Sequence, residues 1–129
     1  MAGVAYLDSS ALVKLVLDEP ERPALARHVT GRPLASSEIA IVEVGRACRR
    51  ARPDAERAGR RLLEGVFLAK LDRQLLEDAA ELTSEALRSL DAIHLASALA
   101  LEPDEFLTYD RRLLGAAAEA GLTVASPGA

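Results

Sequence analysis

A short apolar run that ends in an acid constrains this fold more than any other stretch of the chain. Residues 4–7 (VAYL) stop at Asp8, two hydroxyl residues follow, and an apolar helical pattern begins. This order predicts a buried parallel strand that delivers Asp8 at its carboxyl end and then enters a helix. Ligands of open α/β sheets bind just outside the carboxyl ends of the strands, so Asp8 is a candidate site residue. An equally good interpretation is that Asp8 only caps the helix.

Strand-like and helical segments alternate along the rest of the sequence, and Ser36 and Ser37 are expected to supply a hydroxyl cap at the start of the third helix. Alternation of this kind predicts an α/β fold with a parallel sheet covered by helices on both faces. With 129 residues, half of them hydrophobic, residues 1–129 are expected to form one globular domain. We predict strands at 4–7, 34–35, 66–71, 105–109 and 122–125, and helices at 10–17, 21–29, 38–51, 53–65, 73–82, 90–101 and 111–120.

Composition excludes several classes of protein. The single cysteine, Cys48, excludes an intramolecular disulfide and a cysteine-rich zinc site. No apolar run approaches the ~20 residues needed to cross a bilayer, and the N-terminus lacks the basic segment of a signal peptide. We therefore expect a cytoplasmic protein that does not enter a membrane. Two Tyr, two Phe and no Trp are too few for extended stacking on nucleic-acid bases.

Glu43 is the acid that is hardest to explain by structure alone. It interrupts the apolar segment 39–44 (IAIVEV), where a purely structural helix would place another apolar residue. Carboxylates are rarely buried unless they are paired or bind a metal, so we favour a functional role. The alternative is an exposed salt bridge to Arg46, one helical turn further on.

Asp91 and Asp110 occur in settings that also suggest function. Asp91 lies in the first turn of the most apolar helix, so it is expected to face a cleft, although it could merely complement the helix dipole. Asp110 follows a strand and precedes a helix, as Asp8 does, and could likewise be only an N-cap. Two strand-terminal acids from distant parts of the chain are more suggestive together than either is alone.

Four carboxylates that converge on one point would repel one another unless a cation is present. Hard oxygen ligands suit Mg²⁺ or Mn²⁺, and such a site can generate hydroxide from water and neutralise charge on a phosphate under attack. The hydroxyls of Ser9, Ser10 and Thr108, beside the strand-end acids, could fix carboxylate rotamers or bind water. Ordinary turn and capping chemistry is the alternative for these hydroxyls.

Two histidines and a group of arginines complete the candidates. His94, one turn after Asp91, has hydrophobic neighbours, so we expect a hydrogen-bonded core histidine and not a metal ligand; His28 is expected at the surface. Seven arginines lie between residues 46 and 61. Arg46 and Arg50 share a helical stripe with Glu43 and could bind phosphate groups beside the acids, or they could form a solvated face that keeps the protein soluble.

Four segments of the chain together resemble PIN domains, most closely the VapC-type toxins of type II toxin–antitoxin pairs. They are residues 7–12, 41–44, 90–96 and 108–113. The resemblance covers residues 4 to about 124. It implies an α/β/α sandwich around a short parallel sheet, Mg²⁺- or Mn²⁺-dependent RNA cleavage, homodimerisation, and inhibition by a small cognate VapB-like antitoxin. It carries the family's acidic quartet onto Asp8, Glu43, Asp91 and Asp110, and the family's serine near the first acid onto Ser10.

Two other functions compete with a metal-dependent endoribonuclease. A phosphatase that uses Asp8 as nucleophile would commonly carry an Asp-x-Asp motif, but Ser10 occupies the second position. A degenerate PIN domain could act only as an RNA- or protein-binding module without catalysis. The intact acids argue against this second alternative.

Overall fold

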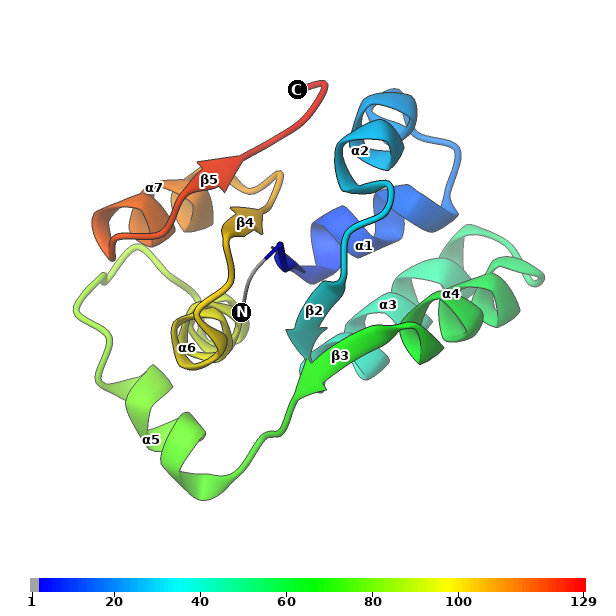
Figure 1. The fold of residues 1–129 in the computed structure, drawn as a ribbon. Helices are drawn as coiled ribbons and strands as arrows, with labels where there is room; N and C mark the ends of the chain where they lie inside the picture. The colour runs from blue at the N-terminus through cyan, green and yellow to red at the C-terminus, as the bar shows by residue number, and fades with distance from the viewer. Residues whose placement is uncertain (1–2) are drawn as a thin grey trace.

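A five-stranded parallel sheet lies at the centre of the computed structural model, which describes residues 3–129 (Figure 1). The strand order is β3-β2-β1-β4-β5, so β1 is central. In the register, Tyr6 of β1 pairs with Ala35 of β2 on one side and with Phe106 of β4 on the other. The strands are β1 (Ala5–Leu7), β2 (Leu34–Ser37), β3 (Val66–Ala69), β4 (Glu105–Leu107) and β5 (Val124–Ala125).

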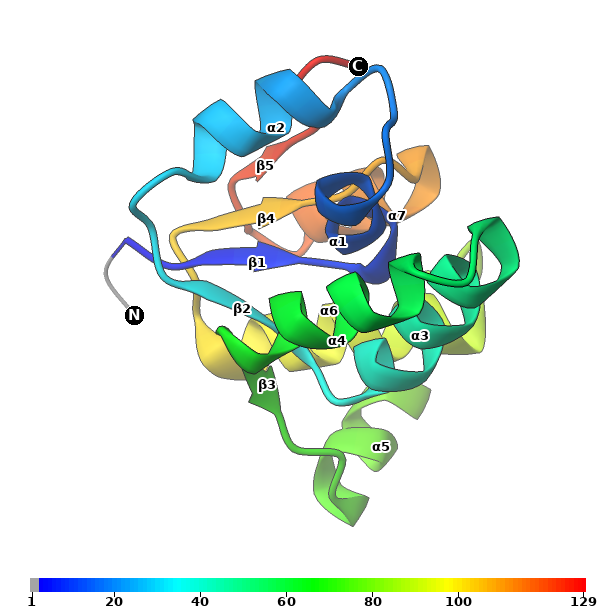
Figure 2. The same ribbon diagram turned by 90° about the vertical axis from the view of Figure 1, so that its right-hand side faces the viewer.

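Two layers of helices cover the two faces of this sheet. Ala5 and Leu7 of β1 pack into a core with α1 to α4, whereas Val4 and Tyr6 pack into a second core with α6 and α7. Figure 2 views the molecule from the side of α1, α3 and α4. The expected α/β/α sandwich is therefore confirmed. The helices are α1 (Ser9–Val16), α2 (Arg22–Val29), α3 (Ile39–Ala51), α4 (Ala55–Glu64), α5 (Arg73–Ala80), α6 (Ser89–Leu101) and α7 (Arg111–Glu119).

Every predicted strand and helix has a counterpart within residues 3–129, with ends displaced by a few residues. One detail differs at the start of α3. Ser36 and Ser37 extend β2, because they pair with Leu68 and Ala69 of β3. Ser37 nevertheless does part of the expected capping, since its Oγ accepts a hydrogen bond from the Ile39 N–H at 3.2 Å. None of the helices described is long and apolar enough to cross a membrane.

Aspartates cap three of the helices, and the capping interpretation predicts two of these caps, Asp8 and Asp110. Asp8 Oδ1 accepts a hydrogen bond from Ala11 N at 3.0 Å at the start of α1, and Asp72 Oδ1 accepts one from Leu75 N at 2.9 Å at the start of α5. Asp110 Oδ1 accepts from two backbone N–H groups at the start of α7. Capping is therefore confirmed for Asp8 and Asp110, but it does not exclude a second role.

Glu105 contacts two basic side chains away from the carboxyl ends of the strands. Its Oε1 lies 2.7 Å from Arg32 Nη1 and 2.8 Å from His28 Nε2. Burial raises the pKa of Glu105, but the hydrogen bonds and charges of Arg32 and His28 outweigh burial and hold the pKa below its ordinary value of 4.5. A carboxyl group whose pKa is lower in the folded state stabilises the fold above its unfolded pKa. This contribution is lost as the pH falls through the folded value.

We expect Glu105→Gln to lower the free energy of unfolding at pH 7 by roughly 1–2 kcal/mol, since it removes charge-assisted hydrogen bonds. The difference from the parent protein should shrink as the pH falls below 4.5. Urea denaturation at pH 7 and pH 3 measures both effects. Glu77→Gln is the matched control, because its pair with Arg73 is exposed and should contribute much less. Equal losses for the two variants at pH 7 would contradict the prediction.

Candidate active site

The candidate site lies where the direction of the strand order reverses. From β1 the chain builds the sheet through β2 to β3 on one side, and β4 and β5 lie on the other side. Ligands of α/β sheets bind outside the carboxyl ends at such a switch point. Asp8 follows β1 directly, and Thr108 and Asp110 follow β4. Thr108 Oγ1 donates to Asp8 Oδ2 at 2.6 Å, so the two strand ends are in direct contact.

Asp8 is the most deeply buried acid of the site, with only 4% of its surface exposed. Besides Thr108 Oγ1 and the backbone N–H of Ala11, Ser10 Oγ donates to Asp8 Oδ1 at 2.7 Å. Burial raises the pKa of Asp8, while the hydrogen bonds from Thr108, Ser10 and Ala11 oppose this rise. Ser10 and Thr108 thus lie beside Asp8 as expected, and both fix its carboxylate.

Glu43 extends from α3 towards α1 and α6. Its Oε1 accepts a hydrogen bond from Ser9 Oγ at 2.6 Å and contacts His94 Nε2 at 2.8 Å. Burial raises the pKa of Glu43, but the hydrogen bonds from His94 and Ser9 outweigh burial and lower the pKa overall. No ion pair joins Glu43 to Arg46 among the residues that the structure describes. The carboxylate is therefore held by the site and not by a surface salt bridge.

His94 is a hydrogen-bonded core histidine, as predicted, with 2% of its surface exposed. Its Nδ1 lies 2.8 Å from Tyr6 Oη, and its Nε2 also lies 3.2 Å from Ser9 Oγ. The sequence did not reveal that His94 and Ser9 both reach Glu43. Two signals pointed towards them: Ser9 adjoins Asp8, and His94 lies one helical turn after Asp91 on α6.

Asp91 shows that the four acids share one electrostatic environment. Burial raises the pKa of Asp91 most, and the charges of Asp110, Asp8 and Glu43 raise it further. Such effects need the carboxylates to lie near one another across little water. The charges of the other three acids therefore reach Asp91, and their convergence on one ion stays a prediction.

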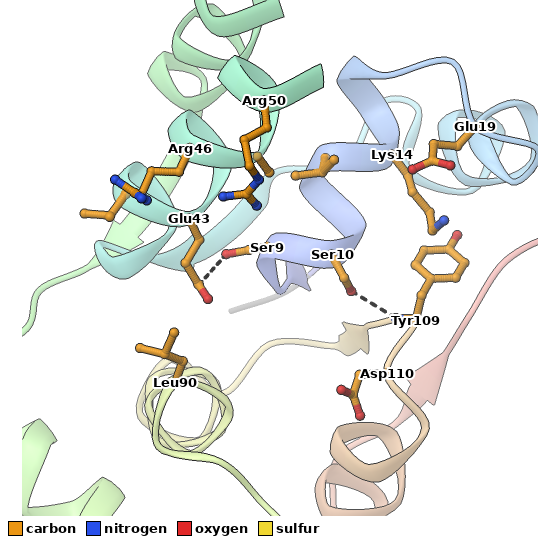
Figure 3. A pocket seen from close by; sticks show the side chains of 13 residues that line it. Ser9, Ser10, Lys14, Glu19, Glu43, Arg46, Arg50, Leu90, Tyr109 and Asp110 are labelled. Carbon is orange, nitrogen blue, oxygen red and sulfur yellow. Dashed lines mark hydrogen bonds between the residues drawn. The ribbon is translucent and has the colours of Figure 1, made fainter. Parts of the chain in front are cut away.

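Two openings give access to three of the four acids. Glu43 and Asp110 line a cleft of about 720 Å³, and Asp91 and Asp110 line a smaller one of about 340 Å³, so Asp110 belongs to both. Figure 3 shows Ser9 directed at Glu43, with Arg46 and Arg50 on the same helix as Glu43. The smaller opening is also lined by three arginines, Arg88, Arg111 and Arg112. Arginine side chains thus border both of the openings that the acids line.

The chemistry of these side chains fits a hard divalent cation. The charged ligands are all carboxylates, hydroxyls stand beside them, and the acids repel one another, which a cation would relieve. Within residues 3–129, no three acidic, histidine or cysteine side chains stand ready to hold an ion in their present orientations. Asp8, Glu43 and Asp110 each direct oxygens at protein donors. Each carboxylate has about four lone-pair positions, so a bound ion can share it with these donors.

Comparison with known proteins agrees with this arrangement. Residues 5–119 match the PIN domain family. The chain is 45% identical to ribonuclease VapC46 of Mycobacterium tuberculosis (strain ATCC 25618 / H37Rv) over 130 residues, which cover 98% of this chain and 99% of the relative. The crystal structure of Mycobacterium tuberculosis VapC20, a Sarcin-Ricin loop cleaving toxin, superposes with a TM-score of 0.77 at 19% identity, covering 95% of this chain and 99% of that one. A toxin–antitoxin complex from Klebsiella pneumoniae gives a TM-score of 0.73 at 24% identity, covering 95% and 97%.

Proposed function

The chain belongs to the PIN domain family, and from this premise we propose that it is an endoribonuclease, the toxin of a VapBC-type toxin–antitoxin pair, and that it uses Mg²⁺ or Mn²⁺. The similar ribonuclease VapC46 supports RNA cleavage. One observation carries the proposal: the ends of β1 and β4, which carry Asp8 and Asp110, are joined by a hydrogen bond, and Asp110 lines openings with both Glu43 and Asp91. Such a cluster of carboxylates suits metal-dependent attack on a phosphodiester.

Asp8, Glu43, Asp91 and Asp110 would hold the divalent ion. When bound, the ion supplies a hydroxide from water and neutralises charge on the phosphate. Ser10 and Thr108 keep Asp8 in one rotamer by donating to its two oxygens. Preorganised supports of this kind are what a metal-binding carboxylate needs.

Arg46 and Arg50 supply the surface on which the RNA backbone binds. Both line the larger cleft with Glu43, and the guanidinium fork matches phosphate oxygens. The scissile phosphate would therefore be held between these two arginines and the ion bound by the four carboxylates.

Replacing both Arg46 and Arg50 by Ala should weaken RNA binding and reduce the slope of log Kd against log salt by about 1–2, since each lost phosphate contact removes roughly one unit or less. Fluorescence anisotropy with a single-stranded RNA between 50 and 300 mM salt measures this slope. The control replaces Arg60 and Arg73 by Ala. Both are exposed and paired with neighbouring acids, so this variant removes the same charge outside the cleft. If the two double variants have the same slope, these two cleft arginines do not bind RNA.

A VapB-like antitoxin is the expected protein partner, which the Klebsiella pneumoniae toxin–antitoxin complex supports. An inhibitor that places one Arg or Lys among the four carboxylates would satisfy them and block the phosphate path together. We also propose a homodimer that acts in the cytoplasm, where its RNA substrates lie. Light scattering of the purified protein tests the dimer.

A degenerate domain without catalysis is the alternative, and one experiment separates the two. The pure protein is incubated with a mixed RNA pool in Mn²⁺, Mg²⁺ or EDTA, and new RNA ends are mapped. The proposal expects defined new ends with either metal and none in EDTA. Unchanged RNA under all three conditions, with no Mn²⁺ bound by calorimetry, would establish the binding module instead.

A further inference from the structure

A buried chain of hydrogen bonds connects the core of the protein to Glu43. Tyr6 Oη lies 2.8 Å from His94 Nδ1, and His94 Nε2 lies 2.8 Å from Glu43 Oε1. Tyr6 comes from β1, His94 from α6 and Glu43 from α3. Glu43 is thereby tied through α6 to the central strand.

The chemistry of the three groups assigns the direction of these bonds. An ionised carboxylate only accepts, so the proton between His94 and Glu43 is on Nε2. In a neutral ring Nδ1 is then an acceptor, and it takes the proton of the Tyr6 hydroxyl. The Ser36 and Ser97 hydroxyls are buried near Tyr6 and oppose the rise of its pKa, but neither makes a hydrogen bond of ordinary geometry within residues 3–129. His94 Nδ1, at 2.8 Å, is the acceptor that the Tyr6 hydroxyl contacts.

Tyr6 is a rigid anchor for this chain. It is fully buried, and its ring stacks on Phe106 with centroids 5.2 Å apart and planes 7° apart. The Tyr6 and His94 rings meet nearly edge to face, at 80°. His94 thus has little freedom to rotate, and neither does the carboxylate that it contacts.

We infer that Tyr6 and His94 are positioning residues of the nuclease: they hold the Glu43 carboxylate in one orientation at the cleft through Tyr6 O–H to Nδ1 and Nε2–H to Oε1. This inference rests on the proposed role of Glu43 in catalysis. Neither Tyr6 nor His94 lines the two openings described above, so neither is assigned a contact with the substrate. Both act only through Glu43.

Tyr6→Phe is the most selective variant, because it keeps the ring and its stacking on Phe106 and removes only the hydroxyl. We expect kcat to fall about 10–100-fold, the usual cost of removing a supporting contact of a metal-binding group. KM should change little, because the arginines of the cleft are untouched. If kcat is unchanged, or if KM rises while kcat stays constant, Tyr6 only packs the core.

Two amides at position 94 separate positioning from packing. Gln places its amide N–H near the position of the histidine Nε2–H and can reach Glu43, whereas the shorter Asn cannot. His94→Gln should therefore keep at least about tenfold more kcat than His94→Asn, even though both lose the ring. Equal kcat values for two folded variants would overturn the inference.

Nitrogen NMR of the full chain in EDTA tests the bond directions without any activity measurement. The sequence holds only His28 and His94, so a His28→Gln variant assigns the spectrum. We expect a protonated Nε2 and an unprotonated Nδ1 in His94, and averaging between tautomers in Tyr6→Phe. The opposite tautomer, or protonation of both nitrogens in the parent protein, would overturn the assignment.

Glu43→Gln distinguishes this inference from the proposed function. If that variant cleaves RNA as fast as the parent, the role of Glu43 in catalysis is wrong, and with it the positioning role of His94. If Glu43→Gln is inactive while Tyr6→Phe and both His94 amides cleave at the parental rate, the proposed function stands and the positioning role fails. Loss of cleavage in Glu43→Gln, together with a graded fall of kcat in Tyr6→Phe, His94→Gln and His94→Asn, supports both the proposed function and the positioning role.

Discussion

Replacing Asp8 by Asn should reduce RNA cleavage by more than about a hundredfold, because even a supporting contact of a metal site is worth 10–100-fold. The fold should persist. Asn caps helices as well as Asp does, and its oxygen can accept the present bonds from Ser10 and Ala11. Thr108 can turn to accept from the amide, since a hydroxyl is both donor and acceptor.

The same variant should melt at an equal or higher temperature in EDTA. The folded pKa of Asp8 lies above its ordinary value of 3.8, chiefly through burial, so at pH 7 the buried charge opposes folding. Mg²⁺ should stabilise the parent protein by mass action and Asp8→Asn much less. Calorimetric melting with and without Mg²⁺, beside a quenched-flow or gel assay of cleavage, measures all three effects.

Asp72→Asn is the matched control for Asp8→Asn. Asp72 caps α5 with the same geometry, at 2.9 Å from Leu75 N, and it follows β3 as Asp8 follows β1. Unlike Asp8, it is not among the acids whose charges raise the pKa of Asp91, so its variant should cleave RNA at the parental rate. If an Asp8→Asn preparation free of contaminating nuclease still cleaves RNA, the assignment of Asp8 as a metal-binding residue is wrong.

The largest loss of stability is expected for Phe106→Ala, about 3–5 kcal/mol. Phe106 is fully buried, stacks on Tyr6 and lies in the core between the sheet and α6 and α7. Truncation leaves a cavity that central strands cannot close. Because whole domains are stable by only about 5–15 kcal/mol, the variant should be partly unfolded at moderate urea. Circular dichroism during urea denaturation gives the free energy of unfolding.

Phe67→Ala makes the same change on an edge strand. Phe67 lies in β3 at the edge of the sheet and is 56% exposed, so its loss should cost within about 0.5 kcal/mol. Similar urea midpoints for the two phenylalanine variants would mean that the core around Phe106 is not the main source of stability.

Much of this fold was predictable because the local signals agree with the global structure. Asp8, Asp72 and Asp110 each mark a strand end and cap the following helix, and Gly121 ends α7 with a positive φ of 97°. Such signals act within a few residues of the chain. The alternation of strands and helices then fixes a parallel sheet with two covered faces.

The sequence could not supply the contacts between distant elements. Ser36 and Ser37 suggested a helix start, but pairing with β3 draws them into the sheet. Glu43 was identified by its apolar neighbours, whereas its partner His94 lies 51 residues away. Hydrophobic periodicity places a residue inside or outside the core and does not identify the side chain that it meets there.

The contact between Asp8 and Thr108 also determines when, during synthesis, the candidate site can form. These residues are 100 positions apart in the chain, and β1 meets β4 only through this long-range parallel pairing. On a ribosome that adds about 5–20 residues per second, Thr108 is made roughly 5–20 s after Asp8. Until β4 emerges, Asp8 has its donors in Ser10 and Ala11 but lacks the one in Thr108, and the cleft lacks Asp110. The site is thus completed only after most of the chain has been made.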